Sequence, residues 1–124
     1  MKFQKDNTFL SGRLKSVTFA VKGALKLIST EHSIMVQFSL AILMTIAGFC
    51  FNITKTEWLF QIVSIGLVMS IEGLNTAVEK VADFIHPDYH ERIGFIKDIS
   101  AGAVLFAAVT AIIIGLIIYT PKFL

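Results

Sequence analysis

The stretch VMSIEGLNTAVEKVAD, residues 68–83, decides the fold of this chain, because an apolar helix reaches carboxylates here before it has crossed a bilayer. Of the 14 residues before Glu72 (58–71), only three carry polar side chains, so this segment belongs in hydrocarbon. The polar residues that follow are Glu72, Asn75, Thr76, Glu79 and Asp83. Their offsets of 3, 4, 7 and 11 from Glu72 place them on one side of a helix, and we call them the polar stripe.

Carboxylates in this part of a spanning helix are costly. Even mild insertion scales assign about 2.5–3.5 kcal/mol to an Asp at a helix centre, so such residues face a partner, a cavity or a metal. The polar stripe therefore indicates either a functional site or a polar seam that holds helices together.

The composition restricts the class of protein. With 124 residues, of which 55% are hydrophobic, and a mean hydropathy of +0.74, the chain is too apolar for a soluble domain and too short for two domains. We expect an all-α integral membrane protein with a single domain over residues 1–124. The net charge of +2 gives no indication of a nucleic-acid partner.

Residues 1–32 are expected to form a polar tail, over residues 1–9, and an amphipathic helix. Apolar residues recur in this helix at spacings of three and four, and lysines occupy its other faces. The apolar residues are Leu10, Leu14, Val17, Val21, Ala24, Leu25 and Ile28, and the lysines are Lys15, Lys22 and Lys26. The hydrophobicity is too low for a span, so we expect this helix to lie on the membrane surface or against the spanning helices.

Three transmembrane helices are predicted, over residues 33–53, 58–85 and 93–119. The first contains 21 residues without formal charge, which is long enough to cross about 30 Å of hydrocarbon. Residues 54–57 are predicted to form a short polar turn. Pro87 is expected to end the second helix and Pro121 the third.

The distribution of basic residues predicts the orientation. Nine lysines and arginines fall on the side shared by the N-terminus and the second loop, against two, Lys55 and Lys122, on the other side. By the positive-inside rule, the N-terminus and the polar stripe face the cytoplasm and the C-terminus lies outside.

Several other charged residues fall on the side of the polar stripe, namely Glu31, Asp88, His90, Glu91, Lys97 and Asp98. Carboxylates without thiolates suit a hard cation such as Mg²⁺, and a lysine suits phosphate. Phosphoryl transfer needs these groups. The chain has neither a P-loop nor a protein-kinase glycine motif, however, so the residues alone favour lipid phosphotransfer no more than a small proton or cation conducting subunit.

Two motifs resemble a known family, the small bacterial membrane kinases that comprise diacylglycerol kinase and undecaprenol kinase. The family signature E-x-L-N-[ST]-A-[IV]-E-x-[VTA]-[VA]-D appears as EGLNTAVEKVAD in residues 72–83, and a later motif appears as IKDISAGAV in residues 96–104. The resemblance extends from Arg13 to the C-terminus. Two positions depart from the family: Met35 stands where relatives often carry Arg, and Gly73 stands where Leu is usual.

The resemblance implies roles for single residues. Glu72 would be the catalytic general base for the lipid hydroxyl, with Asn75 as a catalytic neighbour and Asp83 also at the lipid substrate. Glu31 and Glu79 would bind the nucleotide through Mg²⁺. The other nucleotide-binding residues that it implies are Arg13, Lys15, Asp88, Tyr89, His90, Lys97 and Asp98.

The resemblance also implies an assembly and a substrate. Family members are homotrimers whose active sites are shared between protomers, so a homotrimeric helical bundle in the bacterial inner (cytoplasmic) membrane is expected. The C-terminal residues 100–124 and the TEW of residues 56–58 look more like the undecaprenol kinase branch. We therefore expect MgATP-dependent phosphorylation of the primary hydroxyl of undecaprenol, with diacylglycerol as the alternative lipid.

Overall fold

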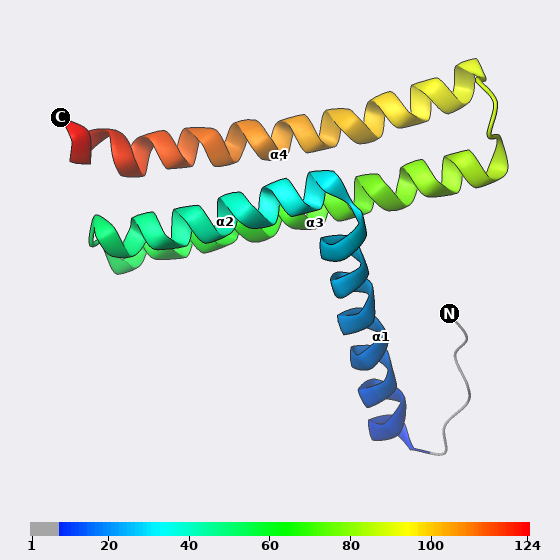
Figure 1. Cartoon of the computed structure of the whole chain (residues 1–124), viewed down its shortest axis with the longest axis horizontal. Coiled ribbons are helices and arrows are strands. Elements are labelled where there is room, and N and C mark those ends of the chain that lie inside the picture. The colour runs from blue at the N-terminus through cyan, green and yellow to red at the C-terminus, as the bar shows by residue number, and fades with distance from the viewer. Residues whose placement is uncertain (1–7) are drawn as a thin grey trace.

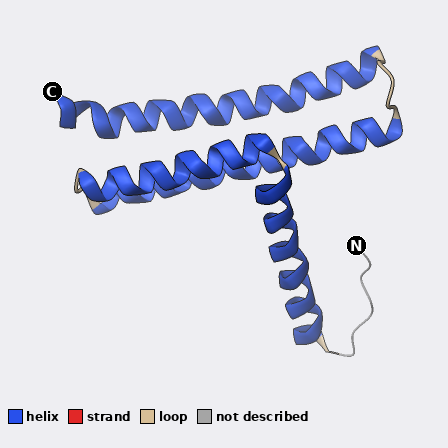
Figure 2. Cartoon of the chain, viewed as in Figure 1, coloured by secondary structure: helices blue, strands red, loops and turns tan. Residues whose placement is uncertain are grey.

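The computed structural model describes residues 8–124, which form four helices (Figures 1 and 2). They are α1 (Phe9–Thr30), α2 (His32–Cys50), α3 (Lys55–Ile85) and α4 (Glu91–Phe123). Most of the predicted polar tail, with Lys2 and Lys5, lies outside the described residues.

Three helices within the described residues are long and apolar enough to cross a membrane: α2, α3 and α4. This agrees with the three spans predicted from the sequence. With 31 and 33 residues, α3 and α4 are each about 46–50 Å long at about 1.5 Å per residue. Since the hydrocarbon core is about 30 Å thick, these two helices are longer than one crossing requires.

The helices are arranged as an antiparallel bundle from which α1 projects (Figure 1). α3 and α4 run side by side, and α2 lies along the first part of α3 only. α1 leaves the bundle at the α1–α2 junction, beside the middle of α3, and points away from it. We call the end with residues 51–54 and the C-terminus the turn end, and the end with residues 86–90 the loop end.

The observed helix ends differ from the predicted ones for local reasons. α2 ends at Cys50 rather than at residue 53, because Asn52 adopts a left-handed conformation with φ of 52°. α3 begins at Lys55 instead of Trp58, because Thr54 and Glu57 form a capping box. Residues 54–57 are therefore a helix start and not the predicted polar turn.

α4 also extends beyond its predicted bounds of 93–119. It begins at Glu91 and continues through Pro121 to Phe123, so Pro121 does not end it. A proline in the last turn removes only one backbone hydrogen bond, which is why the helix can continue past it.

The buried core lies at the turn end. Ile53, Ile118 and Tyr119 are buried there, and Trp58 packs against them. Gly48 is required for this packing, because a Cβ atom at this position would lie 2.5 Å from Cη2 of Trp58. The α2–α3 contact at the turn end thus depends on a residue without a side chain.

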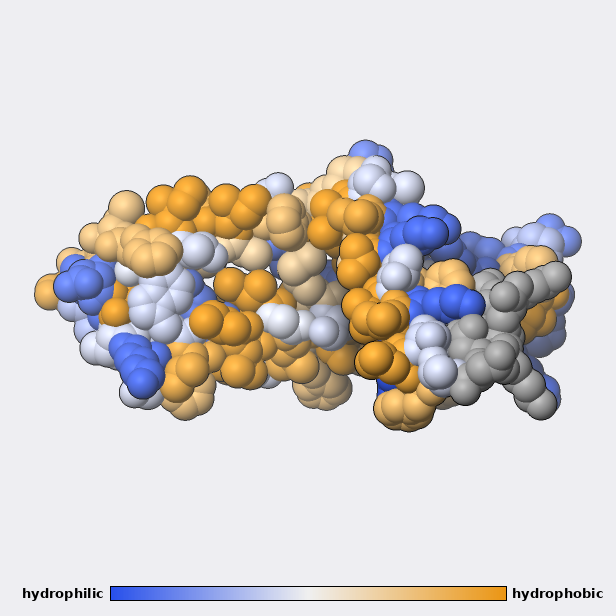
Figure 3. Space-filling model, turned by 90° about the horizontal axis from the view of Figure 1, so that it is seen from below, coloured by the Kyte–Doolittle hydropathy of each residue, from blue (hydrophilic) through white to orange (hydrophobic). Residues whose placement is uncertain are grey.

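Most other apolar side chains are exposed within a single chain. Figure 3 shows apolar side chains over much of the visible face, with hydrophilic ones gathered toward its two ends. No residue of α1 is buried, and its apolar residues Leu10, Leu14 and Val17 are exposed. This distribution is that of a surface covered by lipid or by other protein chains.

Candidate active site

The polar stripe passes from a buried to an exposed environment along α3. Glu72 and Thr76 are only 9% and 6% exposed, Asn75 is half-buried, and Glu79 and Asp83 are exposed. The buried part lies close to the α1–α2 junction, and the exposed part continues toward the loop end. Glu72 is therefore the acid of the stripe that is most withdrawn from water.

Asn75 has an incomplete set of hydrogen bonds. Its Nδ2 donates to Oε1 of Glu79 at 3.4 Å, whereas its Oδ1 is buried and has no partner among the described residues. Buried polar atoms are nearly always hydrogen-bonded in folded proteins. An acceptor one turn from Glu72 is thus available to a donor that the single chain does not supply.

Glu31 reaches the stripe from the junction of α1 and α2. Its side chain does not cap α2, although it occupies the N-cap position. Instead, its Oε1 forms an ion pair with Nζ of Lys80 at a distance of 3.0 Å. Because Lys80 follows Glu79 in α3, this ion pair brings Glu31 to the level of Glu79.

One residue of the polar stripe, Asp83, contacts α4. Nζ of Lys97 donates to Oδ1 of Asp83 at 2.6 Å, which ties α4 to α3 near the loop end. Asp98, the next residue of α4, is exposed. The structure thus brings Asp83 and Lys97 together, and a lysine lies beside an acid of the polar stripe.

The histidines of the loop hold its backbone. His86 donates from Nδ1 to the carbonyl oxygen of Asp88 at 2.6 Å, and Nδ1 of His90 accepts from the backbone N–H of Arg92 at 3.0 Å. The second bond caps the start of α4. Tyr89, between them, is exposed on the outside of the loop.

Arg13 and Lys15 do not join the other predicted site residues within one chain. Both lie in the first half of α1, which points away from α3 and α4 (Figure 1). The guanidinium of Arg13 lies 4.9 Å from the ring centroid of Phe9 on the same helix. Any contact of these residues with the polar stripe requires a different protomer or a movement of α1.

The acids of the site do not form a complete metal cage. Within residues 8–124, no group of three or more His, Cys, Asp or Glu residues is placed to hold a metal ion. Mg²⁺ typically binds through one or two carboxylates and takes its remaining ligands from water and phosphate, so the two predicted ligands Glu31 and Glu79 would be enough in number to hold it. The partnerless Oδ1 of Asn75 adds a further oxygen to this region.

An apolar groove approaches the polar stripe from the turn end. It has a volume of about 330 Å³ and lies between α2, α3 and α4. Its lining on α3 runs from Gln61 to Met69, one helical turn before Glu72, and on α4 it includes the small residues Ala111 and Gly115. Two carboxylates of α3 lie one helical turn from this lining: Glu57, which pairs with Lys122 at the turn end, and Glu72 in the polar stripe.

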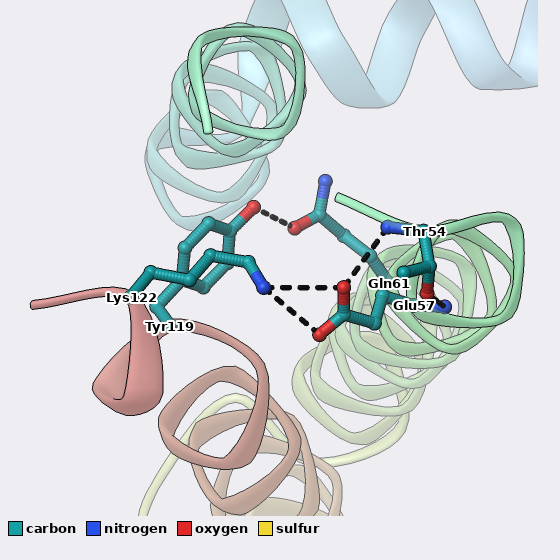
Figure 4. A network of polar contacts seen from close by, with 5 residues as sticks. All are labelled: Thr54, Glu57, Gln61, Tyr119 and Lys122. Atoms are coloured by element: carbon teal, nitrogen blue, oxygen red, sulfur yellow. Dashed lines mark hydrogen bonds and ion pairs between the residues drawn. The ribbon is translucent and has the colours of Figure 1, made fainter. Parts of the chain in front are cut away.

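A second polar network, at the turn end, was missed by the sequence analysis. The hydroxyl of Tyr119 donates to Oε1 of Gln61 at 2.5 Å, and Nε2 of Gln61 donates to the carbonyl oxygen of Met44 at 2.9 Å (Figure 4). Nζ of Lys122 lies 3.2 Å from both carboxylate oxygens of Glu57. The T-x-x-E pattern of residues 54–57 was a readable signal for the capping box, whereas nothing in the sequence paired Gln61 with Tyr119.

Comparison with known proteins places the chain in a family. The family described as prokaryotic diacylglycerol kinase matches residues 18–119. The chain belongs to this family. It is 36% identical over 108 residues to an undecaprenol kinase of Bacillus subtilis (strain 168), which covers 87% of this chain and 88% of the relative.

Other relatives are diacylglycerol kinases. The protein of Escherichia coli (strain K12) is 35% identical over 88 residues, which are 70% of this chain and 72% of the relative. A protein of Synechocystis is 48% identical over 59 residues, 47% of this chain and 34% of the relative. The chain is therefore a membrane lipid kinase of a bacterial family, and this activity implies ATP as the phosphate donor.

Proposed function

We propose that this lipid kinase transfers the γ-phosphate of MgATP to the primary hydroxyl of undecaprenol and so forms undecaprenyl phosphate. The observation that carries the proposal is the position of Glu72, a buried acid beside the partnerless acceptor of Asn75 and one turn from an apolar groove. A lipid alcohol combines the two features that this arrangement suits, an apolar chain and a single hydroxyl donor. The similarity to an undecaprenol kinase supports this choice of lipid.

In this proposal Glu72 is the general base. Its carboxylate accepts the proton of the lipid hydroxyl while the hydroxyl oxygen forms a bond to the γ-phosphorus and the bond from that phosphorus to the β–γ bridging oxygen breaks. The products are the lipid phosphate and ADP. As the lipid binds, its hydroxyl donates to Oδ1 of Asn75, which orients it beside Glu72, and the same proton then passes to Glu72 during the transfer.

The nucleotide lies across the exposed part of the stripe. Glu31 and Glu79 are the residues that would hold Mg²⁺, which, when bound, neutralises charge on the ATP phosphates. Lys97 binds phosphate, and Asp83 holds it toward α3. The remaining nucleotide contacts that we propose are Asp98 beside Lys97, the segment Asp88, Tyr89 and His90 at the adenosine, and Arg13 with Lys15.

We propose further that the kinase is a homotrimer with shared sites. Arg13 and Lys15 lie on α1, which points away from α3 (Figure 1), so a neighbouring protomer is the direct way to bring such residues to the polar stripe. The exposed apolar residues of α1 support a helix that lies on the membrane surface or on another protomer. We propose that the N-terminus and the site lie on the cytoplasmic side of the inner membrane and the C-terminus outside, which the excess of basic residues on the side of the N-terminus supports.

The test is phosphate transfer from γ-labelled MgATP to purified lipids in mixed micelles. Undecaprenol and diacylglycerol are presented separately at the same mole fraction, and the labelled lipids are separated and counted. We expect faster labelling of undecaprenol. Faster labelling of diacylglycerol would overturn the choice of lipid. If the folded protein labels neither lipid, the proposal that it phosphorylates these lipid alcohols is wrong.

A further inference from the structure

The ion pair between Lys80 and Glu31 has a consequence for metal binding, given the proposed function above. Glu31 is a proposed Mg²⁺ ligand, yet its Oε1 lies 3.0 Å from the ammonium group of Lys80. We propose that Lys80 is an internal competitor of the divalent cation, which occupies Glu31 in the nucleotide-free kinase and leaves when the metal–nucleotide complex binds. Lys80 is then a positioning residue that lowers the affinity of the site for the metal–nucleotide complex.

Burial on the two sides of the pair favours this role. The side chain of Glu31 is 25% exposed, so its charge is partly withdrawn from water and gains from a counter-ion. The side chain of Lys80 is 67% exposed, so its head group can return to water at little cost. A lysine that is easily released can neutralise the charge of Glu31 and still leave the carboxylate available to the metal ion.

The position of Glu31 is fixed independently of Lys80. The carboxylate does not cap α2, and the junction lies against α3 through Leu27, whose Cδ1 would be 3.2 Å from a Cβ at Gly73. The glycine that replaces the usual leucine of the family thus lets the end of α1 approach α3. Because packing already places the junction, the ion pair is not needed to bring Glu31 to the site.

Charge repulsion excludes simultaneous occupancy of the same oxygen. An ammonium group at 3.0 Å and a dication at about 2.0–2.1 Å from one carboxylate oxygen lie within a few ångströms of each other, where like charges repel. The dication would be held by a second carboxylate and by phosphate oxygens as well, whereas within residues 8–124 the ion pair of Lys80 is with Glu31 alone. The complex of metal and nucleotide therefore displaces the lysine.

The experiment uses the full-length protein in detergent and the Mn²⁺ complex of a non-hydrolysable ATP analogue. EPR of the manganese measures how tightly this complex binds. Lys80→Met removes the charge and keeps the stem. We expect it to bind the complex about two- to fivefold more tightly than the wild type, the range that an exposed ion pair corresponds to. Lys80→Arg keeps the charge and should match the wild type within twofold.

A double-mutant cycle with Glu31→Gln identifies the partner. In that background, Lys80→Met should leave the affinity for the Mn²⁺ complex unchanged, because the carboxylate with which Lys80 pairs is no longer present. Weaker binding by Lys80→Met in the wild-type background would make Lys80 a phosphate ligand, and unchanged binding would make the ion pair irrelevant; each result overturns the proposal. Thermal unfolding checks that the variants fold.

This experiment uses neither lipid nor turnover, so its result is separate from that of the lipid assay. A kinase that prefers another lipid still shows the expected changes in Mn²⁺ binding. Absence of Mn²⁺ binding by the wild-type protein would overturn both the metal site and the role of Lys80.

Discussion

The two polar regions of α3, at the turn end and in the polar stripe, differ in their hydrogen bonding. At the turn end, Gln61 bonds through both its amide nitrogen and its amide oxygen, and Lys122 pairs with Glu57. In the polar stripe, Oδ1 of Asn75 is buried and has no hydrogen-bond partner among the described residues. Both regions lie on the same helix, yet the unpartnered buried oxygen is in the polar stripe and not at the turn end.

This difference separates structural polar residues from functional ones. Polar groups withdrawn from water normally find partners, so a complete network needs no ligand, whereas an incomplete one indicates a missing donor or cation. Glu57 and Gln61 are thus part of the frame of the bundle. Glu72, Asn75 and Glu79 are the residues that we propose for substrate, nucleotide and metal.

The largest expected effect is the loss of activity in Glu72→Gln. Removing the general base should lower phosphate transfer about 10²- to 10⁴-fold, because glutamine has nearly the same shape but cannot take the proton. The rate is measured with labelled ATP in micelles, and the assembly is checked by size-exclusion chromatography.

Glu57→Gln is the matched control for this substitution. It makes the same change in the same helix, but Glu57 lies at the turn end, where it pairs with Lys122. Glutamine keeps the acceptor oxygen of the capping box, so the phosphate-transfer rate of the folded protein should stay within about twofold of the wild type. Equal losses of rate in both variants would mean that the loss comes from removing a charge from α3 and not from removing the general base.

An intermediate effect is expected at the turn end for Gly48→Ala. The added Cβ would lie 2.5 Å from the indole of Trp58, so the ring and the two helices must separate. Overpacking of this kind costs about 1–3 kcal/mol of stability. The variant should therefore unfold at a lower concentration of denaturing detergent than the wild type. The phosphate-transfer rate of its folded fraction should be unchanged.

Gly66→Ala tests whether this loss is specific. An added Cβ at Gly66 meets nothing within 4 Å, and alanine is the better helix former. Its unfolding midpoint should be equal to that of the wild type or higher. A similar loss at both glycines would show that the cost comes from the helix backbone and not from Trp58.

The smallest effect is expected for Tyr119→Phe. It leaves Oε1 of Gln61 without its donor and should lower stability by about 1 kcal/mol, the usual size for a hydrogen bond between helices in a membrane. The measurement is again unfolding in denaturing detergent, with Thr110→Val in the same helix as the control, because that hydroxyl bonds only to Phe106 of α4. A large loss of phosphate transfer in Tyr119→Phe would mean that the network at the turn end takes part in the reaction and is not only structural.

Much of the fold could be predicted because it depends on local sequence. Long apolar segments gave the three spanning helices, and the helical period placed Glu72, Asn75 and Glu79 on one face. Helix ends were less accurate: the capping box of Thr54 and the left-handed Asn52 shifted two of them. Such ends depend on single side chains that an apolar pattern does not report.

The site could be predicted only as a collection of residues. The motifs of residues 72–83 and 96–104 identified the acids and Lys97, and the family assignment agrees with the lipid kinase that they indicated. They did not predict that Lys97 pairs with Asp83 or that Arg13 lies far from the stripe of its own chain. The roles of the single residues remain predictions.

The sequence by itself determined which segments enter the membrane, which face of α3 is polar and to which family the chain belongs. Only the tertiary structure decided which polar groups are satisfied: Gln61 by Tyr119, Glu57 by Lys122 and Glu31 by Lys80. The physical reason is that the helical period fixes the direction of a side chain within its own helix. Its partner on another helix depends on the rotation and axial offset of the two helices, which packing of the whole chain sets.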